Sequence, residues 1–194
     1  MVHNNGASGS RSGSEQREWG ARWVLTSLFT GQGFILGSRR LWLLSVALQR
    51  AGHPSLAKLV KNVNSALYHN SLHPGVDVSP DVRLGHHAFG TVIHRKVVIG
   101  RGVKIFQNVT MAVRPTDSPH EIVIEDGVVI GASAVIITPR GRGIRIGRGS
   151  RVGAGAVVTH DVPPRSIVIS APAQVLSRDA RTAESDAQDV EAAD

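Results

Sequence analysis

The 194-residue sequence contains no cysteine and has no apolar run long enough to cross a bilayer. Without cysteine, the chain cannot form disulfides, thiolate metal sites or a covalent thioester, so any chemistry must use histidine, carboxylates or hydroxyls. The longest apolar run, residues 41–48, is too short to span a membrane, and the first twenty residues lack the apolar stretch of a secretory signal. These absences predict a soluble, cytoplasmic protein.

Aromatic residues are also scarce, at 4% of the chain, whereas glycine occurs 21 times. The core must therefore consist of Val, Ile, Leu and Ala on a backbone that turns tightly, which favours repetitive β structure over a helical bundle. A chain of this length can bury one substantial core, so we expect a single folded body with appendages.

The net charge of +7 is spread among glycine and valine and is not clustered with stacking aromatics. This distribution does not favour a nucleic-acid partner. Basic residues near a cleft suit an anionic ligand such as a phosphorylated cofactor. The acidic segment 179–194 offsets part of the charge, so the folded body is more basic than the whole chain.

The chain divides by composition into four segments. The composition predicts a disordered arm over residues 1–18 and a disordered acidic tail over 177–194. Between them, it predicts an α-helical segment over residues 19–70 and a β domain over residues 71–176. Within the helical segment, Ser38 is the expected N-cap of a helix over 39–51, Ser55 is the expected N-cap of the next, and residues 19–30 can form a further short helix. The second of these carries one apolar face for packing or subunit contact, made of Leu56, Leu59, Val60, Val63 and Leu67.

After residue 70 the apolar period becomes six. The series runs through Leu72, Val78 and Leu84, slips by one residue to Thr91, Val97, Val103 and Val109, and resumes after a loop at Ile124, Ile130 and Ile136 and then at Ile146, Val152 and Val158. One inward aliphatic per six residues predicts a coil of three short flat strands joined by tight corners, which is a parallel β-helix. Glycine pairs such as Gly147 and Gly149 are interpreted as corners, because no G-x-G-x-x-G, Walker or G-x-S-x-G pattern is present.

Two places in this scaffold are candidate functional sites, because histidine lies where the repeat breaks. His86 and His87 occupy the corner at which the period slips, and His120 lies in the loop that interrupts the repeat. Breaks in a local rule and long loops on regular scaffolds are where functional sites tend to lie. His69 and His73 flank the start of the β-helix and can be either functional or structural.

Three runs resemble serine O-acetyltransferases and their short relatives among the hexapeptide-repeat acyltransferases: LHPGVDVSPDVRLGHHAFGTVIHRKVVIGRGVKIFQNVTM, IEDGVVIGASAVI and IGRGSRVGAGAVVTHDVPP. The resemblance covers residues of about 39–176. It implies a mainly β protein with a left-handed parallel β-helix and an N-terminal α-helical segment. It also implies direct acetyl transfer from acetyl-CoA to a small hydroxyl acceptor, and a homotrimer or a dimer of trimers.

The resemblance assigns roles to individual residues. The segment H-A-F-G-T-V-I places His87 at the position of the general base, with His86 as the other possible occupant. Ser71 stands where the family has an orienting aspartate, and His120 approximately matches a substrate-binding histidine. Ala132 and Ala154 match backbone contacts to CoA. No metal is expected.

Two other functions fit parts of the sequence. A non-catalytic scaffold that binds CoA or serves as a structural β-helix would explain the missing orienting aspartate. A zinc hydratase of the carbonic-anhydrase type uses the same fold, but its G-H-x-x-x-x-H spacing is absent, because Thr91 and Val92 stand five residues after His86 and His87. The acceptor can be serine, another amino-acid-like compound, a sugar or a pathway intermediate.

Overall fold

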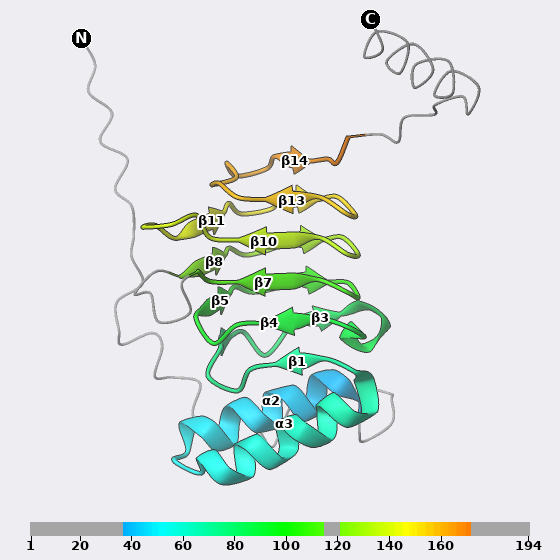
Figure 1. Ribbon diagram of the computed structural model, residues 1–194, viewed down its shortest axis with the longest axis vertical. Helices are drawn as coiled ribbons and strands as arrows, with labels where there is room; N and C mark the ends of the chain where they lie inside the picture. Colours follow the sequence, from blue (N-terminus) through cyan, green and yellow to red (C-terminus); the bar gives the residue numbers. More distant parts are fainter. Residues whose placement is uncertain (1–36, 115–120, 172–194) are drawn as a thin grey trace, which may run out of the picture.

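The computed structural model describes residues 37–114 and 121–171, which form two helices followed by a parallel β-helix (Figure 1). The predicted arm, the predicted helix over 19–30, His120 and the predicted acidic tail lie outside the described residues. The expected fold class, mainly β with parallel sheets wound into a β-helix after a helical segment, is confirmed.

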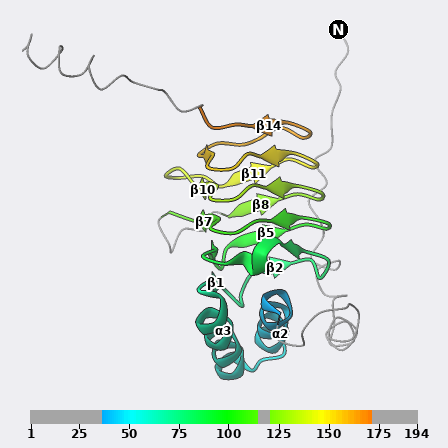
Figure 2. The same cartoon turned by 90° about the vertical axis from the view of Figure 1, so that its right-hand side faces the viewer.

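The two helices, α2 (Ser38–Arg50) and α3 (Pro54–Tyr68), form a hairpin beneath the first coil (Figures 1 and 2). Both predicted N-caps are wrong by one or two positions. Gly37 caps α2, and the buried Ser38 instead accepts a hydrogen bond on its Oγ from Asn70 Nδ2 at 3.0 Å. His53 precedes α3, whose first residue is Pro54, a residue that suits this position because it has no N–H to satisfy.

The predicted apolar face of α3 does not pack into the core. The helix buries Ala57 and Asn64, whereas four large apolar side chains of the predicted face are between 41% and 60% exposed. These are Leu56, Leu59, Val63 and Leu67. The periodicity correctly marked a helix with an apolar face, but that face points away from this chain's own β-helix.

The described β-helix residues form fourteen short strands in three parallel sheets. Sheet A contains β1 (Ser71–Leu72), β4 (Val92–Ile93), β7 (Thr110–Ala112), β10 (Val135–Ile137) and β13 (Val157–Val158). Sheet B contains β2 (Asp77–Val78), β5 (Val97–Ile99), β8 (Ile122–Ile124) and β11 (Ile144–Ile146). Sheet C contains β3 (Arg83–Leu84), β6 (Lys104–Ile105), β9 (Val129–Ile130), β12 (Arg151–Val152) and β14 (Ile167–Val168). Each coil visits the sheets in the order A, B, C.

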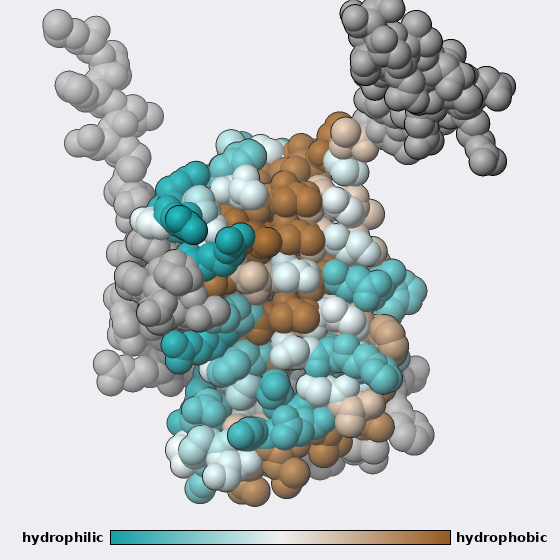
Figure 3. Space-filling model, viewed as in Figure 1, coloured by the Kyte–Doolittle hydropathy of each residue, from teal (hydrophilic) through white to brown (hydrophobic). Residues whose placement is uncertain are grey.

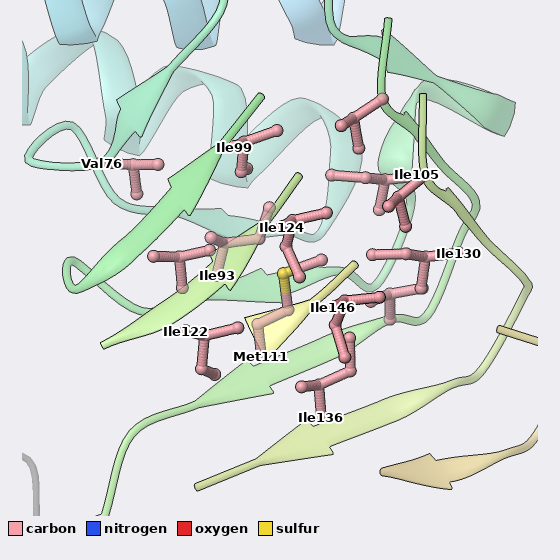
Figure 4. Packing of buried hydrophobic residues seen from close by; sticks show 14 of the residues in the cluster. Val76, Ile93, Ile99, Ile105, Met111, Ile122, Ile124, Ile130, Ile136 and Ile146 are labelled. Atoms are coloured by element: carbon pink, nitrogen blue, oxygen red, sulfur yellow. The ribbon is translucent and has the colours of Figure 1, made fainter. Parts of the chain in front are cut away.

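Inward side chains stack from coil to coil and fill the prism between the sheets (Figure 4). In sheet A the paired positions are Leu72, Ile93, Met111, Ile136 and Val158, and all are buried. Each six-residue unit contributes two inward side chains and not the one expected. Val103 and Ile105, for example, are both fully buried in a single unit.

The strand pairing also corrects the predicted slip at the histidine corner. Leu84 pairs with Ile105, and Ile93 pairs with Met111. Nine positions therefore separate Leu84 from Ile93, where six separate Ile105 from Met111. The corner between β3 and β4 contains three extra residues, because the apparent slip of one came from changing between the two inward positions of the repeat.

Candidate active site

The corner between β3 and β4 has an unusual backbone. Gly85–Ala88 forms a short 3-10 turn in which three consecutive non-glycine residues have positive φ: His86 at 47°, His87 at 56° and Ala88 at 52°. The left-handed region costs an L-residue roughly 1–2 kcal/mol. Conformations of this kind persist only where the surroundings impose them, and they gather at functional sites.

Several contacts impose this conformation. Ala88 is fully buried, and its carbonyl accepts a hydrogen bond from Thr91 N at 3.1 Å. Phe89 O accepts a hydrogen bond from Asn108 N of the next coil at 2.7 Å. Gly90 has φ +67°, and a β-carbon there would collide with Asn108 Oδ1. Only glycine therefore closes the turn without displacing the Asn108 side chain.

The two imidazoles lie on different neighbours. His87 stacks on Tyr68, the last residue of α3, with ring centroids 5.1 Å apart and 29° between the planes. His86 tilts against Phe106 of the next coil at 6.3 Å. Both histidines are exposed, and among residues 37–114 and 121–171 neither ring has a hydrogen-bond partner. Their ring nitrogens are available to a ligand.

Phe106 forms the floor of this corner. Its ring lies so close to Gly85 that a β-carbon there would stand 2.7 Å from Phe106 Cδ1. The ammonium of Lys104 lies 4.6 Å from the centre of the same ring, which is within cation–π range. Thr91 Oγ1 donates to Phe106 O at 3.2 Å.

The same edge, between sheets C and A, carries the predicted CoA contacts. Gly155 N donates to Ala132 O at 2.9 Å, and Ser133 N donates to Gln107 O at 3.0 Å. Gln107, Ala132 and Ala154 therefore occupy equivalent corners in successive coils above the histidine corner. Within the described residues, the N–H groups of Ala132 and Ala154 donate to no other group. A ligand lying along this edge can use them.

Gln107 adds a polar atom that the sequence did not indicate. Its Oε1 is buried and has no hydrogen-bond partner in the part of the chain that the structure describes. A buried amide oxygen ordinarily accepts a hydrogen bond, so this atom fits a donor supplied by a ligand or by water. Tyr68 and Phe106 were also missed. Phe106 could have been found as an aromatic residue at a coil corner, whereas Tyr68 ends a helix and no sequence signal links it to the corner.

Ser71 opens β1 in sheet A, in register with Val92, and its N–H donates to Thr91 O at 2.8 Å. The structure thus places Ser71 at the end of sheet A that adjoins the histidine corner. No carboxylate of the described residues hydrogen-bonds to His86 or His87. The missing orienting aspartate is therefore not replaced by another carboxylate in this part of the chain.

A second histidine pair, His73 and His94, lies at the opposite edge, where sheet A leads into sheet B. His94 was not singled out from the sequence. His73 Nδ1 accepts a hydrogen bond from Gly75 N at 2.9 Å, and His94 Nδ1 accepts one from Lys96 N at 3.2 Å. Burial lowers the pKa of both rings, with further lowering from nearby positive charge, chiefly Lys61 for His73 and Arg95 for His94.

The described residues were considered for a metal site and for a membrane-spanning helix. Among them, no group of three or more histidine, cysteine or carboxylate side chains could hold a metal ion. Neither described helix is both long enough and apolar enough to cross a membrane.

The coils and their paired corners define a protein of the hexapeptide-repeat class, and the sequence model of the hexapeptide repeat of succinyl-transferase matches residues 121–160. The serine acetyltransferase of Salmonella typhimurium is 33% identical over 132 residues, which cover 68% of this chain and 46% of that protein. The enzyme of Mycobacterium tuberculosis is 33% identical over 68% of this chain and 56% of its own length.

Solved structures agree with these sequence relatives. Soybean serine acetyltransferase complexed with serine matches with a TM-score of 0.60 at 30% identity, over 72% of this chain and 56% of that one. Serine acetyltransferase from Brucella abortus in complex with coenzyme A has a TM-score of 0.63 at 24% identity, a likeness of fold alone. The chain is therefore similar to serine acetyltransferases over about two thirds of its own length, and part of its β-helix matches the hexapeptide repeat. It spans about half the length of the curated relatives it matches.

Proposed function

We propose that this chain is an acetyl-CoA-dependent O-acetyltransferase that transfers the acetyl group directly to a small hydroxyl acceptor, with serine as the first candidate. The observation that carries the proposal is the corner at His86 and His87. Three extra residues and a left-handed backbone there present two imidazoles that have no hydrogen-bond partner among the described residues. Along the same edge lie the N–H groups of Ala132 and Ala154, which donate to no group in the described part of the chain.

The chemistry needs one base that returns its proton. The neutral imidazole of His87 accepts the proton of the acceptor hydroxyl as that oxygen attacks the thioester carbonyl carbon. The tetrahedral intermediate then loses its carbon–sulfur bond, and the departing thiolate takes the same proton from the imidazolium. The products are an acetyl ester and CoA with a free thiol. The chain needs no nucleophile of its own, which agrees with the absence of cysteine.

Among the two histidines, we assign the base to His87 and keep His86 as the alternative. The stack on Tyr68 limits the rotation of the His87 ring, so an aromatic neighbour performs the orienting task that the family gives to an aspartate. Ser71 and His120 remain the proposed acceptor contacts. Gln107 Oε1, buried and without a partner among the described residues, is a further candidate on the acceptor side.

The proposed position of CoA follows the edge upward from the histidines. Ala132 is half-buried and Ala154 is exposed, and small side chains at both positions leave the backbone amides accessible to carbonyl oxygens of an extended ligand. A large side chain at Ala154 would fill this space, whereas the same change at Ser133, on the exposed side of its corner, leaves Ala154 unchanged.

A homotrimer, alone or paired as a dimer of trimers, belongs to this proposal. Sheet A presents a stripe of apolar side chains along its coils (Figure 3), which includes Val92 of β4, 43% exposed, and Val157 of β13, 63% exposed. Contiguous exposed apolar surface of this kind marks protein interfaces. We also propose a cytoplasmic location, since acetyl-CoA is a cytoplasmic metabolite.

The test is the release of CoA from acetyl-CoA, followed with a thiol-reactive chromophore. Because the chain has no cysteine, the protein contributes no background thiol. We expect release that depends on a hydroxyl acceptor, with serine compared against other amino acids and sugars. Mass spectrometry should identify the acetyl ester. No release with any acceptor would overturn the proposed activity.

One observation favours a second candidate, a β-helix that binds CoA without turnover. No described carboxylate orients either free imidazole. Calorimetry separates the two candidates. CoA binding that is lost in Ala154→Trp and kept in Ser133→Trp, together with no turnover across the acceptor panel, would support the non-catalytic protein.

A further inference from the structure

The exposed apolar face of α3 is the largest feature that the proposed function leaves unused. We call Leu56, Leu59, Val63 and Leu67 the α3 stripe. The other side of the helix, marked by the buried Ala57, packs toward α2 and the first coil. Apolar side chains also appear at the base of the molecule in Figure 3. Burying such a side chain contributes about 1.5–3 kcal/mol, so leaving all four in water is costly.

A complementary apolar face occurs earlier in the same sequence. Within residues 19–30, five apolar residues follow the spacing i, i+3, i+4, i+7 and i+8, which places them on one side of a helix. These are Ala21, Val24, Leu25, Leu28 and Phe29. A helix of that length is about 18 Å long, and the α3 stripe extends for about 17 Å from Leu56 to Leu67. The two faces match in character and in length.

The connection between the two segments is short. Residues 31–37 join the earlier segment to the start of α2 at Ser38. Because α2 and α3 form a hairpin joined by residues 51–53, the start of α2 lies near the Leu67 end of α3 (Figure 1). A link of seven residues reaches at most about 25 Å and holds the segment at an effective concentration in the millimolar range. A second copy that is free in solution at micromolar concentration competes poorly with a tethered partner, whereas occupancy by a neighbouring subunit of the proposed trimer would give a cross-link between chains.

We infer that residues 19–30 form a helix that docks on the α3 stripe of the same chain, completing a three-helix layer beneath the first coil. The docked helix covers Leu59 and Val63 and buries its own face of Leu25 and Leu28. The inference does not depend on the proposed activity. It does concern the site, because the last residue of α3 is Tyr68, whose ring stacks on His87.

The absence of cysteine makes cross-linking a clean test in the full chain. In the double variant Leu28→Cys with Val63→Cys, we expect copper–phenanthroline to form a disulfide within one chain. It should appear on a non-reducing gel as a monomer of altered mobility that dithiothreitol restores. The matched control is Thr26→Cys with Val63→Cys, because Thr26 lies on the other side of the predicted helix; its cross-linking should be at least about 10-fold slower.

Two outcomes would overturn the inference. Equal cross-linking in the control and the test pair would show that the segment has no fixed position on α3. A dimer band from Val63→Cys alone, or from a mixture of the two single-cysteine variants, would show that a second copy covers the stripe. A second measurement needs no oxidation. In Leu25→Asp with Leu28→Asp, amide exchange over residues 54–68 should accelerate about 10-fold or more, whereas Thr26→Asp, on the other side of the predicted helix, should leave it unchanged.

Discussion

Two histidine pairs flank sheet A, and they are held in opposite ways. At the edge that leads into sheet B, His73 and His94 each accept a backbone N–H two residues ahead, so both rings are fixed to their own corners. At the edge that comes from sheet C, the rings of His86 and His87 each lie against an aromatic ring, have no hydrogen-bond partner among the described residues, and belong to a left-handed backbone.

The difference separates a structural use of histidine from a chemical one. A corner of ordinary length satisfies its polar groups locally, as the six-residue spacing of Leu72 and Val78 around His73 allows. Three extra residues and strained φ angles are needed to leave two imidazoles without partners among the described residues. Strained backbone of this kind gathers at functional sites, which favours a ligand-binding role for the two exposed imidazoles.

The largest expected effect on activity comes from removing the imidazoles that have no hydrogen-bond partner among the described residues. His87→Ala should lower kcat by about 100-fold or more, because loss of a general base commonly costs 10²–10⁴-fold. His94→Asn changes a ring that accepts a backbone hydrogen bond, and it should keep kcat within about 2-fold of the wild type. Steady-state kinetics of acetyl-CoA turnover measure both, and circular dichroism checks the fold of each variant.

The same experiment decides between the two neighbours. If His86→Ala loses the activity and His87→Ala keeps it, the base is His86 and the stack on Tyr68 has another purpose. If His94→Asn is as inactive as His87→Ala, the proposed division between structural and chemical histidine pairs is wrong.

The second effect is on stability and tests the strained corner. Gly90→Ala should lower the free energy of unfolding by about 2–4 kcal/mol, because it adds a left-handed alanine and drives its β-carbon into Asn108 Oδ1. Gly102→Ala is the matched control, with φ +64° but nothing within 4 Å of the added carbon. Its cost should be about 1 kcal/mol, from the backbone alone.

Urea denaturation followed by circular dichroism gives both values. Equal losses at Gly90 and Gly102 would mean that the Asn108 side chain moves away from the new carbon at little cost. The histidine corner would then be no more constrained than an ordinary turn.

The third effect is smaller and concerns the ring that replaces the family's aspartate. Tyr68→Leu should lower kcat by about 10-fold, since an aromatic stack of this kind contributes about 0.5–1.5 kcal/mol. Tyr68→Phe keeps the stacked ring and should retain most of the activity. If both variants fall together, the hydroxyl and not the ring is what His87 requires, and the pH profile of kcat should then differ from that of the wild type.

The repeat and the fold could be predicted from the sequence, because a period of six leaves few other solutions for a core of Val and Ile. The histidine corner was located for the right reason, although its extra length was underestimated, since both Thr91 and Ile93 point inward. Tyr68 could not be found in this way. Its contact with His87 joins a helix end to a corner, and no local period records it.

The direction in which a surface faces was equally hidden. The spacing of Leu59 and Val63 shows that α3 has an apolar side, but not whether that side meets the chain's own core. The hydrogen bond that His94 Nδ1 accepts from Lys96 N also depends on the turn geometry of one corner, which composition does not encode.

The smallest effect tests the tied pair through pH. The folded chain holds the pKa values of His73 and His94 below 6.5, so the unfolded chain binds more protons as the pH falls. The stability from this pair is thus present above pH 6.5 and is lost progressively as the pH falls through the lowered values.

The variant His73→Asn with His94→Asn keeps an acceptor for each backbone N–H without an ionisable group. Its melting temperature should fall less than the wild type's between pH 7 and pH 5, by a margin on the order of 1–2 °C. The exposed His160→Asn is the control and should follow the wild-type curve. A variant curve that coincides with the wild type would mean that folding does not lower the pKa values of His73 and His94, and the contrast between the two edges would rest on hydrogen bonding alone.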